Sequence, residues 1–416
     1  MYFLYQLLIS IILLLSPIIV IFRIFKNKEH QHRFVEKFSL RTKKKISGKL
    51  IWFHGASVGE ILSIIPLIKY YEKKKSIKQI LVTTSTLSSS KVLKKFKFKK
   101  TIHQFYPIDH FLFVEKFIKY WKPSVAIFID SEIWPCMFKK LKQKDIPLLL
   151  LNARITQKTF NKWIKIKNFS NSVFDKISIA YPQNFETEYY LKKLGVSRIN
   201  TIGNLKFSEN NYKHFSKFNK NLKNEFNKKN IWVASSTHKK EEIFCAKAHQ
   251  TLKKKIKNLI TIIIPRHVNR AREIVAEIEK LNFKVVLHST KPVSLKNIDF
   301  YIVDTFGETK KFHKMSCSVF LGGSIIKRGG QNPLEAARFG AKILHGPNTD
   351  NFKDVYKLLK SLNVSKKIKS SNELASSINF KRSKRLGNKI KIIGEKILKK
   401  TIKELDSIIY NEIKKA

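Results

Sequence analysis

A chain of 416 residues and 48.7 kDa is too long for one ordinary hydrophobic core and predicts two or three domains. Its apolar fraction of 43% and aromatic fraction of 12% exclude a disordered chain. The 83 Lys and Arg against 30 Asp and Glu give a net charge of +53, which indicates nucleic acid or an acidic membrane surface as partner, unless most lysines are simply solvated. The 3 cysteines lie far apart in the sequence and form no C-x-x-C motif, which excludes a disulfide framework and a cysteine-based zinc site.

Residues 1–22 carry no charged side chain and are long enough to cross the ~30 Å hydrocarbon core as one helix. They lack the positive start and small-residue cleavage site of a signal peptide. Arg23, Lys26 and Lys28 follow directly, and this excess of cations predicts that the body of the chain is cytoplasmic. We therefore expect a single-span anchor, or a deep interfacial helix, that contributes nothing to the domain cores. The basic body would lie against the anionic surface of an inner membrane.

Strand-like apolar runs alternate with helix-like runs along the body. The strands predicted in the first half are 49–55, 79–85, 124–130, 146–153 and 176–182, with helices at 60–75 and 88–96. After a polar stretch, strands are predicted at 230–236, 259–265, 283–289, 299–304, 317–323 and 341–346. Near-continuous apolar strands separated by helices predict α/β domains with parallel sheets covered on both faces.

Two doubly wound, Rossmann-like domains therefore follow from the pattern. The predicted organisation is an anchor at 1–22, a first domain at 23–208 and a second domain at 209–416, whose final helix can pack back on the first. Ligands of such sheets bind at the carboxyl ends of the strands, so the loops after the strands are the places to look for chemistry.

Acidic residues follow two strands of the first half. Ser57 and Glu60 have the spacing of a helix capping box, so Glu60 either caps its helix or accepts a proton from a hydroxyl. Asp130 and Glu132 follow the strand at 124–130, beside a Trp and a Pro. Lys206 could face a phosphate or a carboxylate. The chain contains no Asp-x-Asp, so a metal-chelated nucleotide sugar is not indicated.

A glycine-rich segment is the most informative part of the second half. Four of the chain's 14 glycines lie between Gly322 and Gly330, which would leave backbone amides open to a ligand. Asn332 as N-cap, Pro333 at the first helical position and Glu335 two residues later predict a helix whose positive end can bind phosphate. The segment is neither a Walker A motif nor a G-x-G-x-x-G motif. A second T-x-x-E pattern ends at Glu308.

Together these motifs resemble those of the lipid A Kdo transferases, Kdo being 3-deoxy-D-manno-octulosonic acid. The resemblance covers nearly the whole chain in family order, through HGASVGE, DSEIWP, NARIT, GNLKF, SSTH, PRH, LGGS and RGGQNPLEAARFGAKILHGPNTDNFKD. Asp130 stands where a Glu is frequent, and Gln331 where a His is frequent.

The resemblance implies a GT-B glycosyltransferase whose two domains face a cleft. It would transfer Kdo from CMP-Kdo to a hydroxyl of the tetraacylated disaccharide bisphosphate lipid A precursor, with inversion, in lipopolysaccharide core biosynthesis. Glu60 would be the proton acceptor, and Glu132 and Lys206 would stabilise the transition state. The implied CMP-binding residues are Pro265, Arg266, Gly307, Glu308, Thr309, Asn332, Pro333, Leu334 and Glu335. Further donor-site candidates are Ser235, Ser236, Thr237, His238, Gly322 and Gly323. No metal or other cofactor is expected.

Two other functions remain open on the sequence. One is a GT-B enzyme that uses another nucleotide sugar on a membrane lipid. The other is a membrane-tethered nucleic-acid-binding protein, but the aromatic platforms and modules typical of that class are not visible. We therefore expect no nucleic-acid partner.

Overall fold

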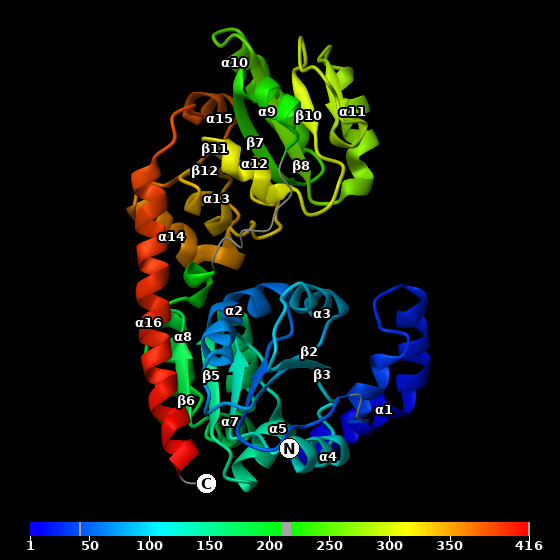
Figure 1. Cartoon of the computed structure of the whole chain (residues 1–416), viewed down its shortest axis with the longest axis vertical. Coiled ribbons are helices and arrows are strands. Elements are labelled where there is room, and N and C mark those ends of the chain that lie inside the picture. Colours follow the sequence, from blue (N-terminus) through cyan, green and yellow to red (C-terminus); the bar gives the residue numbers. More distant parts are fainter. Residues whose placement is uncertain (41–42, 210–217, 415–416) are drawn as a thin grey trace. The chain divides into compact units, whose positions relative to one another are not determined.

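The computed structural model describes residues 1–40, 43–209 and 218–414. The chain divides into two compact units, Met1–Glu209 with Ile393–Ala416, and Asn210–Ile392, each built on its own sheet (Figure 1). The predicted second domain, 209–416, includes a final helix that can pack back on the first, and the structure groups the end of that helix with the first unit. Part of the polar stretch between the predicted domains, 210–217, lies outside the described residues.

The first unit contains a six-stranded parallel sheet in the order β3-β2-β1-β4-β5-β6. The strands are β1 (Leu50–His54), β2 (Gln79–Thr84), β3 (Thr101–Phe105), β4 (Val125–Ile129), β5 (Leu148–Ala153) and β6 (Ile179–Pro182). The five strands predicted from the sequence are confirmed, and β3 is additional. The strand order reverses between β1 and β4, which is the position where doubly wound sheets bind ligands.

Helices cover both faces of this sheet because its central strands are buried on both sides. They are α2 (Val58–Glu72), α3 (Leu87–Lys94), α4 (Phe111–Trp121), α5 (Pro135–Gln143), α6 (Gln157–Ile164), α7 (Lys167–Phe174) and α8 (Phe185–Lys193). The long apolar helix α1 (Tyr2–Phe25) precedes them, and by length and composition it can cross a membrane. The short helix η1 (Arg33–Phe38) lies between α1 and β1.

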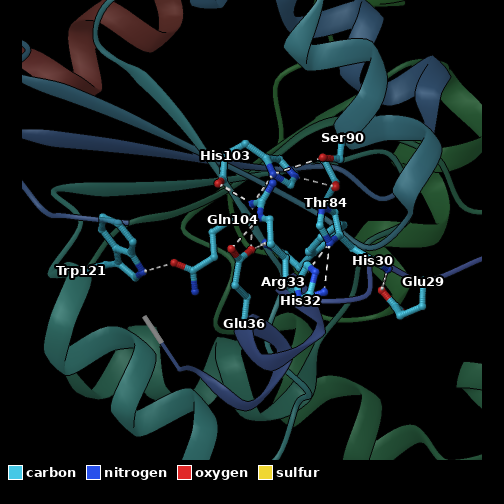
Figure 2. A network of polar contacts seen from close by, with 11 residues as sticks. Glu29, His30, His32, Arg33, Glu36, Thr84, Ser90, His103, Gln104 and Trp121 are labelled. Carbon is cyan, nitrogen blue, oxygen red and sulfur yellow. Dashed lines mark hydrogen bonds and ion pairs between the residues drawn. The ribbon is translucent and has the colours of Figure 1, made fainter. Parts of the chain in front are cut away.

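Polar side chains close the free edge of the first sheet at β3. Glu36 is fully buried and accepts hydrogen bonds from the Phe105 backbone N–H (2.7 Å) and from Arg33 Nε (2.7 Å). Arg33 Nη2 also donates to the His103 carbonyl (2.9 Å), as Figure 2 shows. An edge strand paired in this way offers fewer free backbone groups to another chain. The polar residues His103, which also contacts Arg33, and Gln104, which accepts from Trp121, are why β3 does not stand out in the sequence.

The second unit contains a seven-stranded parallel sheet in the order β13-β12-β11-β7-β8-β10-β9. The strands are β7 (Asn230–Thr237), β8 (Leu259–Pro265), β9 (Val285–Leu287), β10 (Phe300–Ile302), β11 (Ser318–Leu321), β12 (Lys342–His345) and β13 (Ser365–Lys367). The six predicted strands are confirmed, and only the short edge strand β13 is additional. The order reverses between β7 and β11, so the loops after these two strands share the ligand-binding position.

The helices of the second unit are α9 (Lys220–Asn227), α10 (Glu241–Lys253), α11 (Ala271–Glu279), α12 (Thr309–Met315), α13 (Leu334–Arg338), α14 (Lys353–Ser361) and α15 (Ser371–Ser377). The last helix, α16 (Lys384–Lys414), is 31 residues long and continues into the first unit. There Tyr70 Oη donates to Asp406 Oδ2 (2.6 Å), and Lys400 Nζ donates to the Thr201 carbonyl (3.0 Å).

Candidate functional site

Glu60 lies at the carboxyl edge of β1, in the first turn of α2. Ser57 is the N-cap of this helix and its hydroxyl accepts from the Glu60 backbone N–H. The Glu60 carboxylate in turn accepts from the Ala56 backbone N–H (2.7 Å) and from Ser57 Oγ (2.6 Å). The capping box is therefore present. It does not exclude the chemical role, because a carboxylate offers about four acceptor positions and these contacts use only two.

Glu132 is held over the end of β4 by two side chains. Its Oε2 lies 3.0 Å from His54 Nε2 and accepts from Trp134 Nε1 (3.0 Å). His54 is fully buried at the end of β1, where its other ring nitrogen lies 3.0 Å from Thr83 Oγ1. His54 is a functional candidate that the motifs alone do not mark. It ends β1 and begins the string HGASVGE, and a histidine at the carboxyl end of a strand is a usable sequence signal.

Asp130 and Lys206 form an ion pair at the same edge. Lys206 Nζ lies 2.9 Å from Asp130 Oδ2, and both side chains are largely buried. Lys206 belongs to the short helix η2 (Leu205–Ser208), whose start is capped by the Asn204 side chain (2.9 Å). The structure thus brings Glu60, Glu132 and Lys206 to one sheet edge.

The carboxylates at this edge influence one another. Burial raises the pKa of Glu60, and the negative charges of Glu132 and Asp130 raise it further, against the hydrogen bonds from Ser57 and Ala56 that lower it. A raised pKa makes Glu60 a better proton acceptor than an ordinary surface carboxylate.

In the second unit a buried carboxylate, Glu241, organises the glycine-rich loop. Its Oε2 accepts from the backbone N–H of His238 (3.0 Å) and Gly323 (2.7 Å). Its Oε1 accepts from Ser324 N (3.1 Å) and Ile325 N (3.0 Å). These amides therefore serve Glu241, which corrects the expectation that this part of the loop offers them to a ligand. The residue was missed, although its place three residues after His238 at a helix start indicates a cap.

Gly322 packs directly against the loop after β7. A Cβ at this position would lie 2.4 Å from the Ser236 carbonyl oxygen and 2.6 Å from Thr237 Cα, both backbone atoms. Gly322 and Gly323 thus hold the ends of β11 and β7 together. Their role in the structure is close backbone packing and the contact with Glu241.

A buried histidine links two of the candidate donor-site residues. His313, in α12, places Nε2 3.0 Å from Ser235 Oγ and Nδ1 3.4 Å from Glu335 Oε1. Burial raises the pKa of Glu335, but His313, together with the positive charges of Lys310 and Arg338, holds that pKa below its ordinary value. His313 lies inside a helix without any motif, so the sequence gives no signal for it.

Cationic groups surround His238, just after β7. Burial lowers the pKa of His238, and Arg328 and Arg266 lower it further by their positive charge, whereas Glu241 raises it. Arg266 follows β8 and its backbone N–H donates to the Thr237 carbonyl (2.9 Å). Pro265 ends β8 opposite Thr237 in the parallel ladder. This concentration of positive charge is suited to an anionic ligand.

The remaining candidate residues lie before α12 and α13. The second T-x-x-E pattern does not form a capping box, because α12 begins at Thr309, after Gly307 and Glu308, and Glu308 pairs with Lys311 instead. Asn332 Oδ1 accepts from the Leu334 backbone N–H (3.0 Å), but the helix begins one residue later than predicted, at Leu334, with Pro333 at the N-cap position. The helix that follows spans only Leu334–Arg338, which limits the dipole expected at its start.

Comparison with known proteins identifies the family. Residues 31–209 match the family described as "3-Deoxy-D-manno-octulosonic-acid transferase (kdotransferase)". The chain is 34% identical over 354 residues to the 3-deoxy-D-manno-octulosonic acid transferase of Rickettsia felis, which covers 84% of this chain and 75% of the relative. It is 32% identical over 381 residues to the transferase of Rickettsia bellii, with 91% and 90% covered. The chain belongs to the 3-deoxy-D-manno-octulosonic acid transferase family.

The structure of this protein is similar to that of a solved glycosyltransferase from Rickettsia africae, with a TM-score of 0.54 at 12% sequence identity. The match covers 88% of this chain and 100% of that chain. At this identity the likeness concerns the fold alone. The fold is GT-B, with two parallel Rossmann-like sheets, as the sequence predicts. The chain is thus a glycosyltransferase. Within the described residues, no group of three His, Cys, Asp or Glu side chains is arranged to hold a metal ion.

Proposed function

We propose that this protein transfers Kdo from CMP-Kdo to a hydroxyl of the tetraacylated disaccharide bisphosphate lipid A precursor, with inversion and without a metal ion. The observation that carries the proposal is the group of Glu60, Glu132 and Lys206 at the edge of the first sheet, in a chain of this family.

Glu60 is the proton acceptor in this proposal. It takes the proton of the acceptor hydroxyl as the hydroxyl oxygen attacks the anomeric carbon of Kdo, and the bond from that carbon to the phosphate of CMP breaks. CMP leaves with the bonding electrons as a phosphate monoester anion. The raised pKa of Glu60 supports this role. Glu132, oriented by His54 and Trp134, and Lys206, oriented by Asp130, stabilise the charges that develop in the transition state.

The second unit holds the donor. Arg266, in the positive surroundings of His238, binds the phosphate of CMP, and this cationic site replaces the metal ion that other nucleotide-sugar enzymes use. Glu335, fixed by His313, accepts hydrogen bonds from the ribose hydroxyls. Pro265, Gly307, Glu308, Thr309 and the segment Asn332 to Leu334 complete the CMP site, and Ser235 to His238 with Gly322 and Gly323 form its floor. The same phosphate site suits other nucleotide sugars, so the sugar must be identified by experiment.

The body of the protein lies on the cytoplasmic side of the inner membrane, to which α1 attaches it. The apolar composition of α1 and the cations that follow it support this location. A membrane location suits the acceptor, because a lipid with four acyl chains does not diffuse through water.

The test is mass spectrometry of the products that the purified protein forms from CMP-Kdo and the lipid A precursor. Glu60→Gln should lower the rate by 10²–10⁴-fold, since it removes the proton acceptor and keeps the shape. Ser57→Ala is the comparison variant: it removes the cap, which costs about 1 kcal/mol of stability, and one hydrogen bond to the Glu60 carboxylate, so it should lower turnover far less than Glu60→Gln. Normal turnover of Glu60→Gln, or a product with another sugar, would contradict the proposal.

Metal independence is tested in the same assay. Activity should survive EDTA, because Arg266 and its neighbours supply the positive charge for the leaving phosphate. Loss of activity in EDTA that Mg²⁺ or Mn²⁺ restores would contradict metal independence.

A further inference from the structure

The polar side chains in the first three turns of α1 lie on one face of the helix. Tyr2, Tyr5, Gln6 and Ser10 recur at spacings of one, three and four residues, which places them on neighbouring positions of the helix surface. In a helix that crosses a bilayer, such groups would face hydrocarbon without hydrogen-bond partners.

Each of these side chains has a hydrogen-bond partner in the part of the first unit that follows α1. Tyr5 Oη donates to Asp109 Oδ2 (2.8 Å), and Gln6 Oε1 accepts from the Phe111 backbone N–H (3.0 Å). Tyr2 Oη donates to the Ser172 carbonyl (3.2 Å), and Ser10 Oγ lies 3.2 Å from His110 Nε2. The contacts reach the loop before α4, the start of α4 and helix α7.

Two of these contacts complete the starts of helices in the body. Asp109, which is 1% exposed, also accepts from the backbone N–H groups of Cys136 and Met137 (both 2.9 Å) at the start of α5. Gln6 satisfies the first N–H of α4. Tyr2 and Tyr5 pack their rings on Phe169, at centroid distances of 5.0 and 6.3 Å. The first three turns of α1 thus belong to the packed body of the unit.

The far end of α1 is also tied to the first unit. Arg23 Nε lies 3.2 Å from Glu29 Oε2, and Glu29 is buried and pairs with Lys37 of η1 as well. Helix η1 is fixed to β3 through Glu36 and Arg33 (Figure 2). Tyr5 and Arg23 are separated by about 27 Å of helix rise. Both ends of α1 are therefore held on one side of any membrane that the unit touches.

We infer that α1 does not cross the bilayer but lies within one leaflet, with the N-terminus and the body on the same side. Of the two arrangements expected from the sequence, the contacts fit the interfacial helix and not the single span. The face of α1 that points away from its contacts is apolar and exposed, with Phe3, Leu14 and Ile18 at 81, 80 and 70%. The occupant of this face is the acyl layer of an anionic leaflet.

Charge and shape around α1 fit such a leaflet. A groove of about 940 Å³ runs between α1 and helices α4 and α5, and Phe111 and Leu112 stand exposed beside it. Lysines on α4 and α5 line the same groove, among them Lys116, Lys119 and Lys139. An anionic leaflet binds a surface that has apolar side chains beside cations. The apolar side chains contact the acyl chains, and the cations contact the headgroup phosphates.

A cross-linking test distinguishes the two arrangements without any assay of catalysis. The Gln6 side chain contacts Cys136 Sγ through its terminal amide, so a shorter cysteine at this position lies a few ångströms from that sulfur, and Gln6→Cys should be joined to Cys136 when the full chain in native membranes is treated with a short bifunctional methanethiosulfonate, which bridges two thiols through two disulfides. Peptide mass spectrometry identifies the linked pair. Leu8→Cys, on the exposed face, and Gln6→Cys with Cys136→Ser should not give it. Failure of Gln6→Cys to cross-link in an active enzyme, or a cross-link between two chains, would overturn the inference.

The side on which the N-terminus lies gives a second measurement. A cysteine added before Met1 and the body variant Lys144→Cys are labelled with a membrane-impermeant maleimide in vesicles of each orientation. Both should react in the same orientation. Labelling of the N-terminus only in the opposite orientation would mean that α1 crosses the bilayer.

Discussion

The ion pair between Lys206 and Asp130 holds the only cation among the three residues that we place in catalysis. Its side chains are 15 and 7% exposed, so removal of the lysine leaves a carboxylate with little access to water. Such a loss is more costly than the loss of a surface ion pair, because the remaining charge stays desolvated. This makes it possible to separate the structural role of Lys206 from its chemical role.

Lys206→Met should lower the free energy of unfolding by about 3 kcal/mol and abolish turnover. The double variant Lys206→Met with Asp130→Asn should regain most of the stability and remain inactive, because it removes the buried charge but does not restore the cation. Urea unfolding and the product assay measure the two effects. Recovery of turnover in the double variant would show that Lys206 acts only as the partner of Asp130.

In the proposed donor site, His313 acts as a positioning residue for Glu335, 3.4 Å from its carboxylate. His313→Leu removes the hydrogen bond and the charge of His313, which are the main causes that lower the pKa of Glu335. Burial remains, so the pKa of Glu335 should rise. In the native protein, by contrast, the lowered pKa keeps Glu335 ionised at neutral pH, and its contribution to stability is lost only as the pH falls through that lowered value. The KM for CMP-Kdo should therefore rise several-fold between pH 8 and pH 5 in His313→Leu and change little in the native enzyme.

The measurement is a pH series of kcat and KM for both proteins. His313→Gln, which keeps a hydrogen-bond donor, should restore part of the native behaviour. If kcat and KM of His313→Leu differ from the native values by the same factor at every pH, His313 has a purely structural role.

At the scale of elements, α16 fixes the segment that carries Lys206. Gly394 of this helix packs so closely on η2 that an added Cβ would overlap the carbonyl oxygen of Phe207, the residue after Lys206. In a helix interior Gly→Ala normally gains about 1 kcal/mol from conformational entropy. At Gly394 the added Cβ would overlap backbone atoms of Phe207, which cannot move aside as easily as a flexible side chain.

Gly394→Ala should therefore destabilise the first unit by about 1–3 kcal/mol and lower kcat, since Phe207 must move and Lys206 moves with it. Lys396→Ala, an exposed change in the same helix, should leave both unaffected. Thermal unfolding and turnover are compared for the two variants. An increase in stability of Gly394→Ala would show that the packing of α16 on η2 is loose.

The elements that the sequence predicts are those whose burial is uniform. Strands such as β1 and β8 are apolar throughout because both faces are covered, and their runs stand out. The edge strands β3 and β13 contain polar residues such as His103 and Lys366, so their pattern resembles loops. At the site, Glu60, Glu132 and Lys206 could be predicted because they lie in motifs. His313 could not, because no motif marks it and its partners come from distant segments. His54 and Glu241 stand at recognisable positions, a strand end and a helix start, but their partners also come from distant segments.

At the scale of the whole molecule, α1 is more than an attachment. The expectation that residues 1–22 contribute nothing to a core is wrong: Tyr2 and Tyr5 pack against the hydrophobic core of the first unit, and Tyr5 bonds to the buried Asp109. Deleting this segment would expose part of the unit, so the deletion cannot measure membrane binding alone. Substitutions beyond the third turn can, because that part of the helix exposes its apolar face.

Under the membrane location that we propose, the net charge of +53 and the apolar face of α1 would act as two separate means of holding the body to the membrane. Leu14→Ser, Ile18→Ser and Ile21→Ser together remove apolar area from the exposed face and keep the docked turns. The triple variant should still float with anionic liposomes at low salt, through roughly 1 kcal/mol per well-placed cation. Its binding should fall as salt rises to ~0.5 M, where the Debye length is about 4 Å, and neutral liposomes should bind it poorly. The native chain should float with both lipid types with little dependence on salt, because apolar insertion is not screened. Equal, salt-insensitive binding of the triple variant to both lipid types would mean that the lysines are solvated and that the charge does not contribute to membrane binding.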